Sequence, residues 1–347
     1  MVDARMKLAP RELEVLRTIV EDYIAHAAPV GSRTVSKRSG LSLSPASIRN
    51  TMADLTDMGF LEQPHTSAGR EPTAKAFRFY LDHVLRPTVL SEQEQHLITQ
   101  YLGGAGLELT DILRQCSRLL SSLSNQVSMV LAPPTDDVRW KNIDFVSVRP
   151  GLAMAILVLE GGMMQNRLIS VDENLGQDDL VTFSNYLNHH FTGRTLTEVR
   201  LRVLRELSGA KERLDALTRH ALRLARDAFE TSRERDLFVD GTLNILSQPE
   251  FADMATMREL LALLEERTQL LHILDSTLEG GKITVCLGRE ELDELKDYSL
   301  VTTPYGSEDS ARGVVGVMGP LRMDYAKVMP LVDFTARMLT ELLKKRF

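Results

Sequence analysis

The chain has 347 residues, of which 43% are hydrophobic and 26% charged, and its formal net charge is −7. This composition is typical of a globular protein with two or three domains, and the negative charge argues against a protein that coats nucleic acid. It contains no run of about 18 apolar residues and no apolar export segment at the N-terminus, so we expect a cytoplasmic protein with no membrane association.

Charge is divided unevenly along the chain. Residues 1–90 hold 12 Lys or Arg against 10 Asp or Glu, so the remainder carries a net charge of −9. Such a protein would bind a polyanion through one local patch and repel it elsewhere. The distribution favours a regulator that recognises a particular DNA site.

Two helices are predicted at the N-terminus. Apolar residues recur at helical spacing in residues 10–27, and Pro29 ends this pattern. Residues 32–39 are predicted as a second helix with Arg33, Lys37 and Arg38, which we place near DNA phosphates. A solvated charged face is the alternative interpretation of these three cations.

A third helix carries the predicted DNA-reading face. Ser44 is placed to cap it, and Pro45 suits its first position. Ile48, Met52 and Leu55 share one face and should pack inward. The predicted outward residues are Ala46, Ser47, Arg49, Asn50 and Ala53. Arg and Asn make bidentate contacts with guanine and adenine edges, and small residues allow a close approach to the groove.

After this helix the sequence predicts a wing. Residues 60–63 have the pattern of a strand, and residues 64–72 that of a polar loop with Gly69 and a short return. The loop residues expected to contact phosphates or a minor groove are His65, Thr66, Ser67 and Arg70. We interpret the N-terminal part as a winged helix-turn-helix, although a helical hairpin with a polar loop has the same pattern.

The remainder of the chain alternates between helical and strand-like patterns. A mixed α+β sensor-type domain interrupted by a helical insert accounts for this order. The predicted helices cover residues 74–85, 91–101, 109–123, 178–191, 196–207, 210–229, 251–278 and 328–345. The predicted strands cover residues 127–131, 143–148, 152–159, 163–171, 238–239, 283–287, 299–303 and 313–318, the first four as an antiparallel meander.

DNA binding of this kind predicts a dimer. One helix-turn-helix reads only a few base pairs, and two copies on a palindrome add their discrimination energies. The heptad-like stripe predicted as the dimer interface consists of Leu214, Leu217, Ala221, Leu224 and Ala228. The same stripe could instead form the internal core of the insert.

Patterns for catalysis, a cofactor or a metal are weak or missing in the sequence. It has no GxGxxG after a strand, no GxxxxGK[ST], no HExxH and no GxSxG. His189 and His190 are adjacent and would point about 100° apart on a helix, so they cannot chelate from one face. Cys116 and Cys286 are expected as buried reduced thiols. We therefore expect no enzyme, no cofactor and no metal. The polar residues at predicted strand ends that weakly suggest a small ligand are Arg149, Glu160 and Arg322.

Four motifs resemble one known family. They are Arg49-Asn50-Thr51-Met52, the run from Pro64 to Arg70, Pro72-Thr73, and the run from Arg78 to Asp82. Together they are similar to the heat-inducible transcription repressor (HrcA) family, and the run Pro-His-Thr-Ser-Ala-Gly-Arg is specific to it. The likeness continues to the C-terminus. The chain departs from the family pattern at Ala76-Phe77, where Gly-Tyr is usual.

This resemblance implies an α+β multidomain protein. A winged helix-turn-helix would precede a GAF-like mixed α/β domain that holds an inserted helical dimerisation domain. The boundaries we expect are 1–88 for the DNA-binding domain, 89–106 for a linker helix and break, 107–176 and 238–347 for the two parts of the GAF-like domain, and 177–237 for the insert. Recurrent family motifs are expected at 241–246, 288–290 and 313–325.

The resemblance also implies a function. The protein would be a sequence-specific repressor of heat-shock chaperone genes that binds double-stranded DNA as a homodimer, at an inverted-repeat operator called CIRCE. The chaperonin GroEL would keep it active. The alternative is a metabolite-responsive winged-helix regulator whose GAF-like domain binds a ligand.

Overall fold

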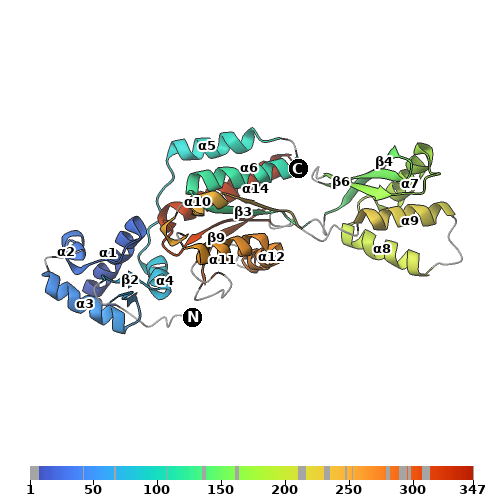
Figure 1. The fold of residues 1–347 in the computed structure, drawn as a ribbon. Coiled ribbons are helices and arrows are strands. Elements are labelled where there is room, and N and C mark those ends of the chain that lie inside the picture. The colour runs from blue at the N-terminus through green and yellow to red at the C-terminus, as the bar shows by residue number, and fades with distance from the viewer. Residues whose placement is uncertain are drawn as a thin grey trace.

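The computed structural model shows three parts in a row (Figure 1). We call them the head (residues 8–83), the body (residues 92–132 and 235–346) and the insert (residues 138–229). The residues that the structure describes are 8–41, 43–65, 68–106, 108–134, 138–160, 164–209, 216–229, 235–246, 248–251, 253–278, 282–288, 295, 298–306 and 313–346. The insert lies at the end of the molecule that is farthest from the head.

The head is a small helical unit with a two-stranded hairpin. Its elements are α1 (Pro10–His26), α2 (Ser32–Arg38), α3 (Pro45–Asp57), β1 (Leu61–Glu62), β2 (Glu71–Pro72) and α4 (Ala74–His83). The two strands pair antiparallel, with Leu61 opposite Pro72. Thr73 caps α4 by accepting the N–H of Ala76 at 3.3 Å, so this helix begins at a local signal in its sequence. The apolar core of the head includes Leu16, Ile19, Val35, Ile48, Leu55, Phe60 and Phe77.

The body is built on an antiparallel sheet with the strand order β7-β3-β10-β9-β8. These strands are β3 (Val127–Leu131), β7 (Leu237–Asp240), β8 (Thr284–Leu287), β9 (Tyr298–Tyr305) and β10 (Gly313–Pro320). Helices α6 (Leu109–Ser124) and α14 (Tyr325–Arg346) cover one face, with α5 (Glu92–Gly103) packed against them. Helices α11 (Met254–Glu265) and α12 (Arg267–Ser276) cover the other face. The strands are therefore apolar on both sides, Val130 facing the first layer and Met129 the second.

The prediction of a four-stranded meander is wrong for its first strand. Strand β3 pairs with β10 and β7 in the body sheet. Only β4 (Trp140–Arg149), β5 (Leu152–Leu159) and β6 (Met164–Ser170) form a meander. All five residues of β3 are buried, as in a central strand covered on both faces, whereas the strands of the meander alternate between buried and exposed.

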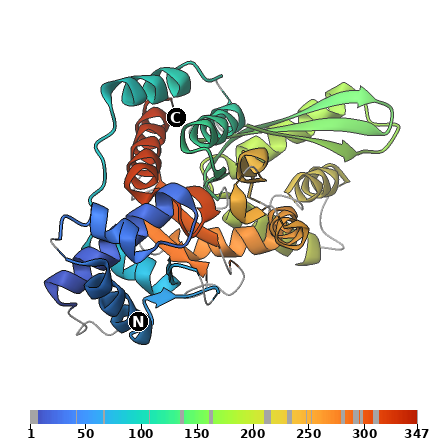
Figure 2. The same cartoon turned by 60° about the vertical axis from the view of Figure 1, so that its left-hand side comes forward.

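The insert joins this meander to helices α7 (Gln177–Phe191), α8 (Leu196–Gly209) and α9 (Ala216–Phe229). Trp140 and Phe145 of the sheet share one hydrophobic core with Leu180 and Phe183 of α7. We expected the strands in the GAF-like part and the insert only at residues 177–237. In the structure the chain leaves the body sheet after β3 and rejoins it at β7, and Figure 2 shows the strands of the insert extending away from the body.

One predicted helix of the body is two helices in the structure. Residues 251–278 were expected as a single helix, but α11 and α12 meet at Glu266, whose ψ of 77° is not helical. Asp253 caps α11 by accepting the N–H groups of Ala255 and Thr256, each at 3.1 Å. Two short turns, α10 (Thr242–Leu246) and η2 (Pro249–Phe251), precede it. Within the described ranges, none of the helices is long and apolar enough to cross a bilayer.

Candidate DNA-binding interface

A tight turn sets the angle between α2 and α3. Gly40 follows the end of α2 with a φ of 65°, in the left-handed region that favours glycine. The Ser36 hydroxyl donates to the carbonyl of Leu43 at 2.9 Å. The Ser44 hydroxyl accepts the N–H of Ser47 at 3.2 Å, which is the predicted cap of α3. Side chains on both sides of the turn therefore hold α3 in place.

Helix α3 has one buried face and one exposed face. Ile48 and Leu55 are 0% exposed and Met52 is 4% exposed, as the helical spacing predicted. Arg49 and Asn50 are exposed, as are Ala46 and Ala53 on the same side. Ser47 is only half-exposed. Its N–H donates to the Ser44 hydroxyl, and its carbonyl accepts the hydroxyl of Thr51 at 3.2 Å. The helix thus exposes an arginine and an asparagine, side chains of the kinds that can contact base edges, between small residues.

The three cations of α2 do not have the same environment. Arg33 and Lys37 are exposed. Arg38 forms an ion pair with Asp22 of α1, whose side chain is only 10% exposed. This ion pair joins α2 to α1. The sequence pattern did not reveal that Arg38 has a partner within the head. Asp22 precedes Arg38 by 16 residues, so no short spacing pattern indicates this pair.

The loop between β1 and β2 lies against the start of α2. A Cβ on Gly69 would come within 2.5 Å of the Val30 carbonyl group, so only glycine fits at this point of the run predicted as a wing. Val30 and Arg70 exchange two backbone hydrogen bonds, at 2.9 and 3.0 Å. The Arg70 Nε donates to the Thr56 hydroxyl of α3 at 3.1 Å, so this arginine braces the loop against α3. His65 is exposed, and Thr66 and Ser67 lie outside the described residues.

The stem of the hairpin is acidic. Glu62 and Glu71 are directly opposite each other on β1 and β2. Burial, and then the charge of Glu62, raise the pKa of Glu71 above its usual value. Burial, and then the charge of Glu71, raise the pKa of Tyr23 to about 12. The hairpin stem is therefore unsuited to a polyanion, whereas α2 and α3 carry exposed cations.

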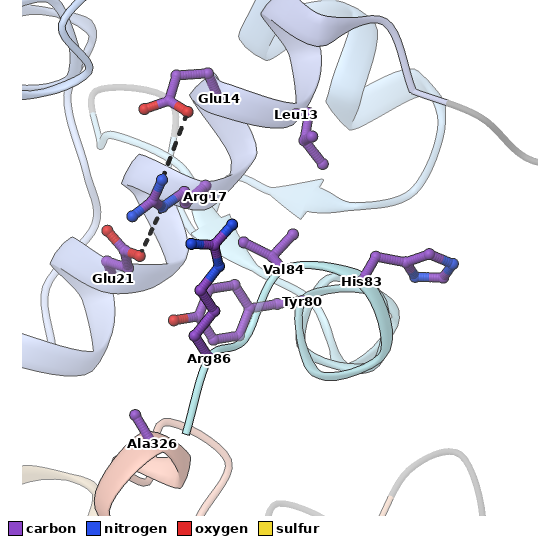
Figure 3. Close-up of a pocket in the computed structure, with 9 residues that line it drawn as sticks. All are labelled: Leu13, Glu14, Arg17, Glu21, Tyr80, His83, Val84, Arg86 and Ala326. Carbon is purple, nitrogen blue, oxygen red and sulfur yellow. Dashed lines mark hydrogen bonds and ion pairs between the residues drawn. The ribbon is translucent and has the colours of Figure 1, made fainter. Parts of the chain in front are cut away.

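A pocket of about 420 Å³ lies where the head meets the body (Figure 3). It is lined by residues of α1 and α4, by Arg86 and by Ala326 of α14. Inside it Arg17 pairs with Glu21 at 2.9 Å and lies 3.9 Å from Glu14, so its charge is balanced locally. Over the part of the chain that the structure describes, no cluster of three His, Cys, Asp or Glu could hold a metal ion. Cys116 and Cys286 are buried free thiols, as expected.

The stripe predicted as a dimer interface lies largely inside the insert. Ala221 is 0% exposed and Leu224 is 5% exposed, and both belong to the core that α9 shares with the sheet. Ala228 packs against the same core. Leu214 lies outside the described residues, as does the side chain of Leu217. These positions favour the alternative that the stripe is internal core.

A different face of the insert is apolar and exposed. We define the open sheet face by seven outward apolar residues of the meander, and polar residues lie among them, with Asp144 and Asn166 opposite Ile156. The seven are Val146, Val148, Met154, Ile156, Val158, Met164 and Leu168. Met164 is 61% exposed and Leu168 54% exposed, whereas the alternate residues of β5 face the core. Met154 lies opposite both Val146 and Leu168, so the apolar residues are contiguous across the three strands.

The head and the body together define a class of protein. A helix that buries one face and presents Arg49 and Asn50 on the other, beside a helix with exposed cations, is an arrangement suited to binding duplex DNA. Joined to a larger α+β body, it is that of a DNA-binding transcription regulator.

Comparison with known proteins names the family. Residues 110–329 match the model of the HrcA protein C terminal domain. A heat-inducible transcription repressor HrcA from Nitratidesulfovibrio vulgaris (strain DSM 19637 / Miyazaki F) is 50% identical over 98% of this chain and 97% of its own length. The HrcA of Geobacter sulfurreducens is 41% identical over 97% of this chain and 98% of its own. The chain belongs to the HrcA family of heat-inducible transcription repressors.

A solved structure shares the fold. It is described as a hypothetical protein and covers 98% of this chain and 100% of its own, with a TM-score of 0.69 and 24% identity.

Proposed function

We propose that this chain represses heat-shock chaperone genes by binding an inverted-repeat operator as a homodimer. The head would act as a winged helix-turn-helix, the body as a GAF-like domain and the insert as the dimerising unit. The observation that carries the proposal is α3, which exposes Arg49 and Asn50 while its opposite face is buried in the core of the head. The similarity to relatives named as heat-inducible repressors supports the target genes.

The contacts to DNA follow from the exposure of each group. Asn50 and Arg49 would read base edges in the major groove, where Ala46 and Ala53 allow the helix to come close. Arg33 and Lys37 would hold phosphates and set the register. Arg38 and Arg70 would act mainly as braces for α2 and the loop, since each already has a side-chain partner. His65, Thr66 and Ser67 would contact the backbone or a minor groove from the loop.

The second copy would dock on the open sheet face. Contiguous apolar area of this kind is rarely left exposed in a monomer, and a two-fold contact pairs such a face with itself. The insert lies at the far end of the molecule from the head, so contact there leaves both α3 helices free for DNA (Figure 1). An inverted repeat requires this geometry, because each of its two half-sites is bound by the head of one copy.

The family resemblance supports two further parts of the proposal. The operator would be the inverted repeat CIRCE, and GroEL would maintain the folded, DNA-competent repressor. On heating, unfolded clients occupy the chaperonin, the competent population falls by mass action, and the genes are released. Adding purified GroEL to partly inactivated repressor should raise the fraction that binds operator. An unchanged fraction would contradict the chaperonin step.

The experiment that tests the function is a gel shift with an inverted-repeat duplex and a scrambled duplex of equal length and composition. We expect the inverted repeat to bind at least on the order of 10³-fold more tightly, because specific sites differ from random DNA by this much or more. Both duplexes must be compared at one salt concentration. Equal affinity for the two would contradict a site-specific repressor.

A further inference from the structure

The head is attached to the body by a joint that combines apolar and polar contacts. Phe77 of α4 lies between Tyr23 of α1 and Tyr325 of α14, with ring centroids 6.4 Å apart on each side. The N–H of Thr88 donates to the carbonyl of Ala326 at 2.9 Å. The apolar core is continuous from the head into the first helical layer of the body. The head therefore sits on the body in a defined orientation.

Arg322 of the body reaches across this joint. Its side chain is 13% exposed and pairs with Glu250, with Nη2 at 3.0 Å from Oε2, and Nη2 also donates to Gln248 Oε1 at 2.8 Å. Its Nη1 donates to the carbonyl of Ile24 in the last turn of α1, at 3.4 Å. Carbonyls there have no partner within the helix, and a cation is favourable at a helix C-terminus. Glu250 and Gln248 thus hold Arg322 in position beneath the end of α1.

Arg78 makes the reciprocal contact from the head. It lies on α4, and its Nη2 donates to the carbonyl of Val285 at 3.0 Å. Val285 belongs to β8, which is an edge strand of the body sheet, so backbone groups on its free side need partners from outside the sheet. Each side of the joint therefore supplies one guanidinium to a backbone carbonyl of the other.

The joint is incompletely packed alongside these bridges. The pocket of Figure 3 runs beside α1 between Leu13 and Glu21 and reaches α4, Arg86 and Ala326. Apolar contact alone is weakly directional, so the apolar part of the joint does not by itself fix the rotation of the head. Hydrogen bonds are directional, so those made by two arginines with fixed partners restrict the rotation of the head more than the apolar contact area of the joint does.

We propose that Arg78 and Arg322 are positioning residues that set the spacing between operator half-sites at which the repressor binds. The inference rests on the proposed dimeric binding of an inverted repeat. With the two inserts fixed against each other by the dimer contact, the separation and relative rotation of the two α3 helices depend on the joints within each chain, and the head–body joint is the one that holds α3. Half-sites that a dimer reads lie on defined faces of the duplex, which turns once in roughly 34–36 Å. A rigid joint selects one spacing, and a loosened joint accepts several.

The test uses the full-length protein and a series of duplexes. One variant is Arg78→Met, and the other combines Arg322→Met with Glu250→Gln so that no half-buried carboxylate is left without its partner. Arg337→Met is the matched control, because Arg337 lies on α14 but is 65% exposed and pairs with Asp333 on the surface. Each protein is titrated with inverted repeats whose spacer is varied over about half a helical turn, and with a single half-site. Sedimentation reports the dimer, and thermal melting reports folding.

We expect the wild type and Arg337→Met to show the same sharp optimum of spacing. The joint variants should remain folded dimers with unchanged half-site affinity, while the ratio between best and worst spacing falls roughly 10-fold, a usual size for coupling between sites. An unchanged ratio in both folded joint variants would overturn the inference. Failure of the proposed function would look different, because the wild type itself would then prefer no spacing or bind as a monomer.

Discussion

The two ends of this molecule each expose a face that is backed by a buried layer, but the two faces have opposite chemistry. On α3 the outward residues are Arg49 and Asn50 between alanines, over Ile48 and Leu55 in the core. On the open sheet face they are mostly apolar, with Met164 and Leu168 more than half exposed and Asp144 and Asn166 lying among them. The exposure of a surface therefore does not by itself indicate which kind of partner it binds.

The difference supports the partner proposed for each face. Side chains with fixed hydrogen-bonding groups gain free energy only against a surface that presents complementary donors and acceptors, as the major groove does. Apolar side chains gain it from any apolar surface that removes them from water, and a second copy of the same face provides one. The prediction of a dimer stripe on α9 did not separate buried from exposed apolar residues. A heptad-like pattern shows only that apolar residues recur at helical spacing, and it does not show whether they are exposed.

The largest effect is expected when the buried side of the insert is charged. Leu224→Glu places a carboxylate at a position that is 5% exposed, and we expect it to lower the free energy of unfolding by about 3–5 kcal/mol. Urea unfolding followed by circular dichroism measures this loss. A variant as stable as the wild type would show that Leu224 does not belong to the core.

Charging the open side should act on assembly instead. Leu168→Glu is expected to leave the fold intact, to dissociate the dimer and to weaken operator binding on the order of 100-fold, because the second half-site is lost. Sedimentation velocity and fluorescence anisotropy report the two effects. The control is Leu243→Glu, at a position in the body that is 80% exposed and outside the open sheet face. If Leu168→Glu still forms dimers at the wild-type concentration, the dimer contact lies elsewhere.

Removing the side-chain amide of Asn50 should affect mainly the operator, if the role proposed for it is right. Asn50→Ala is expected to cost about 1–3 kcal/mol on the inverted repeat and little on scrambled DNA. Anisotropy titrations with the two duplexes separate the outcomes. An equal loss on both sequences would mean that Asn50 contacts the backbone and reads no base.

Neighbouring cations of α2 provide a finer contrast. Lys37→Gln should weaken binding equally on all sequences and reduce the slope of log K against log salt by about 1, because one phosphate contact is lost. Arg38→Gln should change that slope less and lower thermal stability instead, since it breaks the ion pair with Asp22. The reverse pattern would exchange the roles proposed for these two residues.

The smallest effect is expected in the core of the head, away from both faces. Burial raises the pKa of Tyr80 to about 12 from its usual value near 10. The folded state therefore holds this proton more tightly, so the associated stability is complete below pH 10 and is lost as the pH rises towards 12. Melting temperatures of Tyr80→Phe should decline less steeply than the wild type across this window. Parallel declines would assign the titration to another group.

The head was predictable from the sequence because its signals are local. Ser44 and Pro45 mark the start of α3, and the spacing of Ile48, Met52 and Leu55 gives its buried face. The pairing of β3 with β10 was not predictable, since residues nearly 190 apart in sequence meet there and no short pattern records such a contact. The partners of Arg38, Arg70 and Arg322 were hidden for the same reason. The spacing of apolar residues in the sequence identifies the apolar face of a helix or strand. Packing between elements that are distant in sequence decides whether that face is buried or exposed.

The most direct test of the account is methylation protection of guanine N7, which lies in the major groove, on the inverted-repeat duplex. The account predicts that the wild type protects guanines in both arms symmetrically, that Arg49→Ala loses protection in both, and that Leu168→Glu protects neither arm at the same protein concentration. Protection in one arm only, or protection that survives Arg49→Ala together with Asn50→Ala, would contradict two copies of α3 reading the two half-sites.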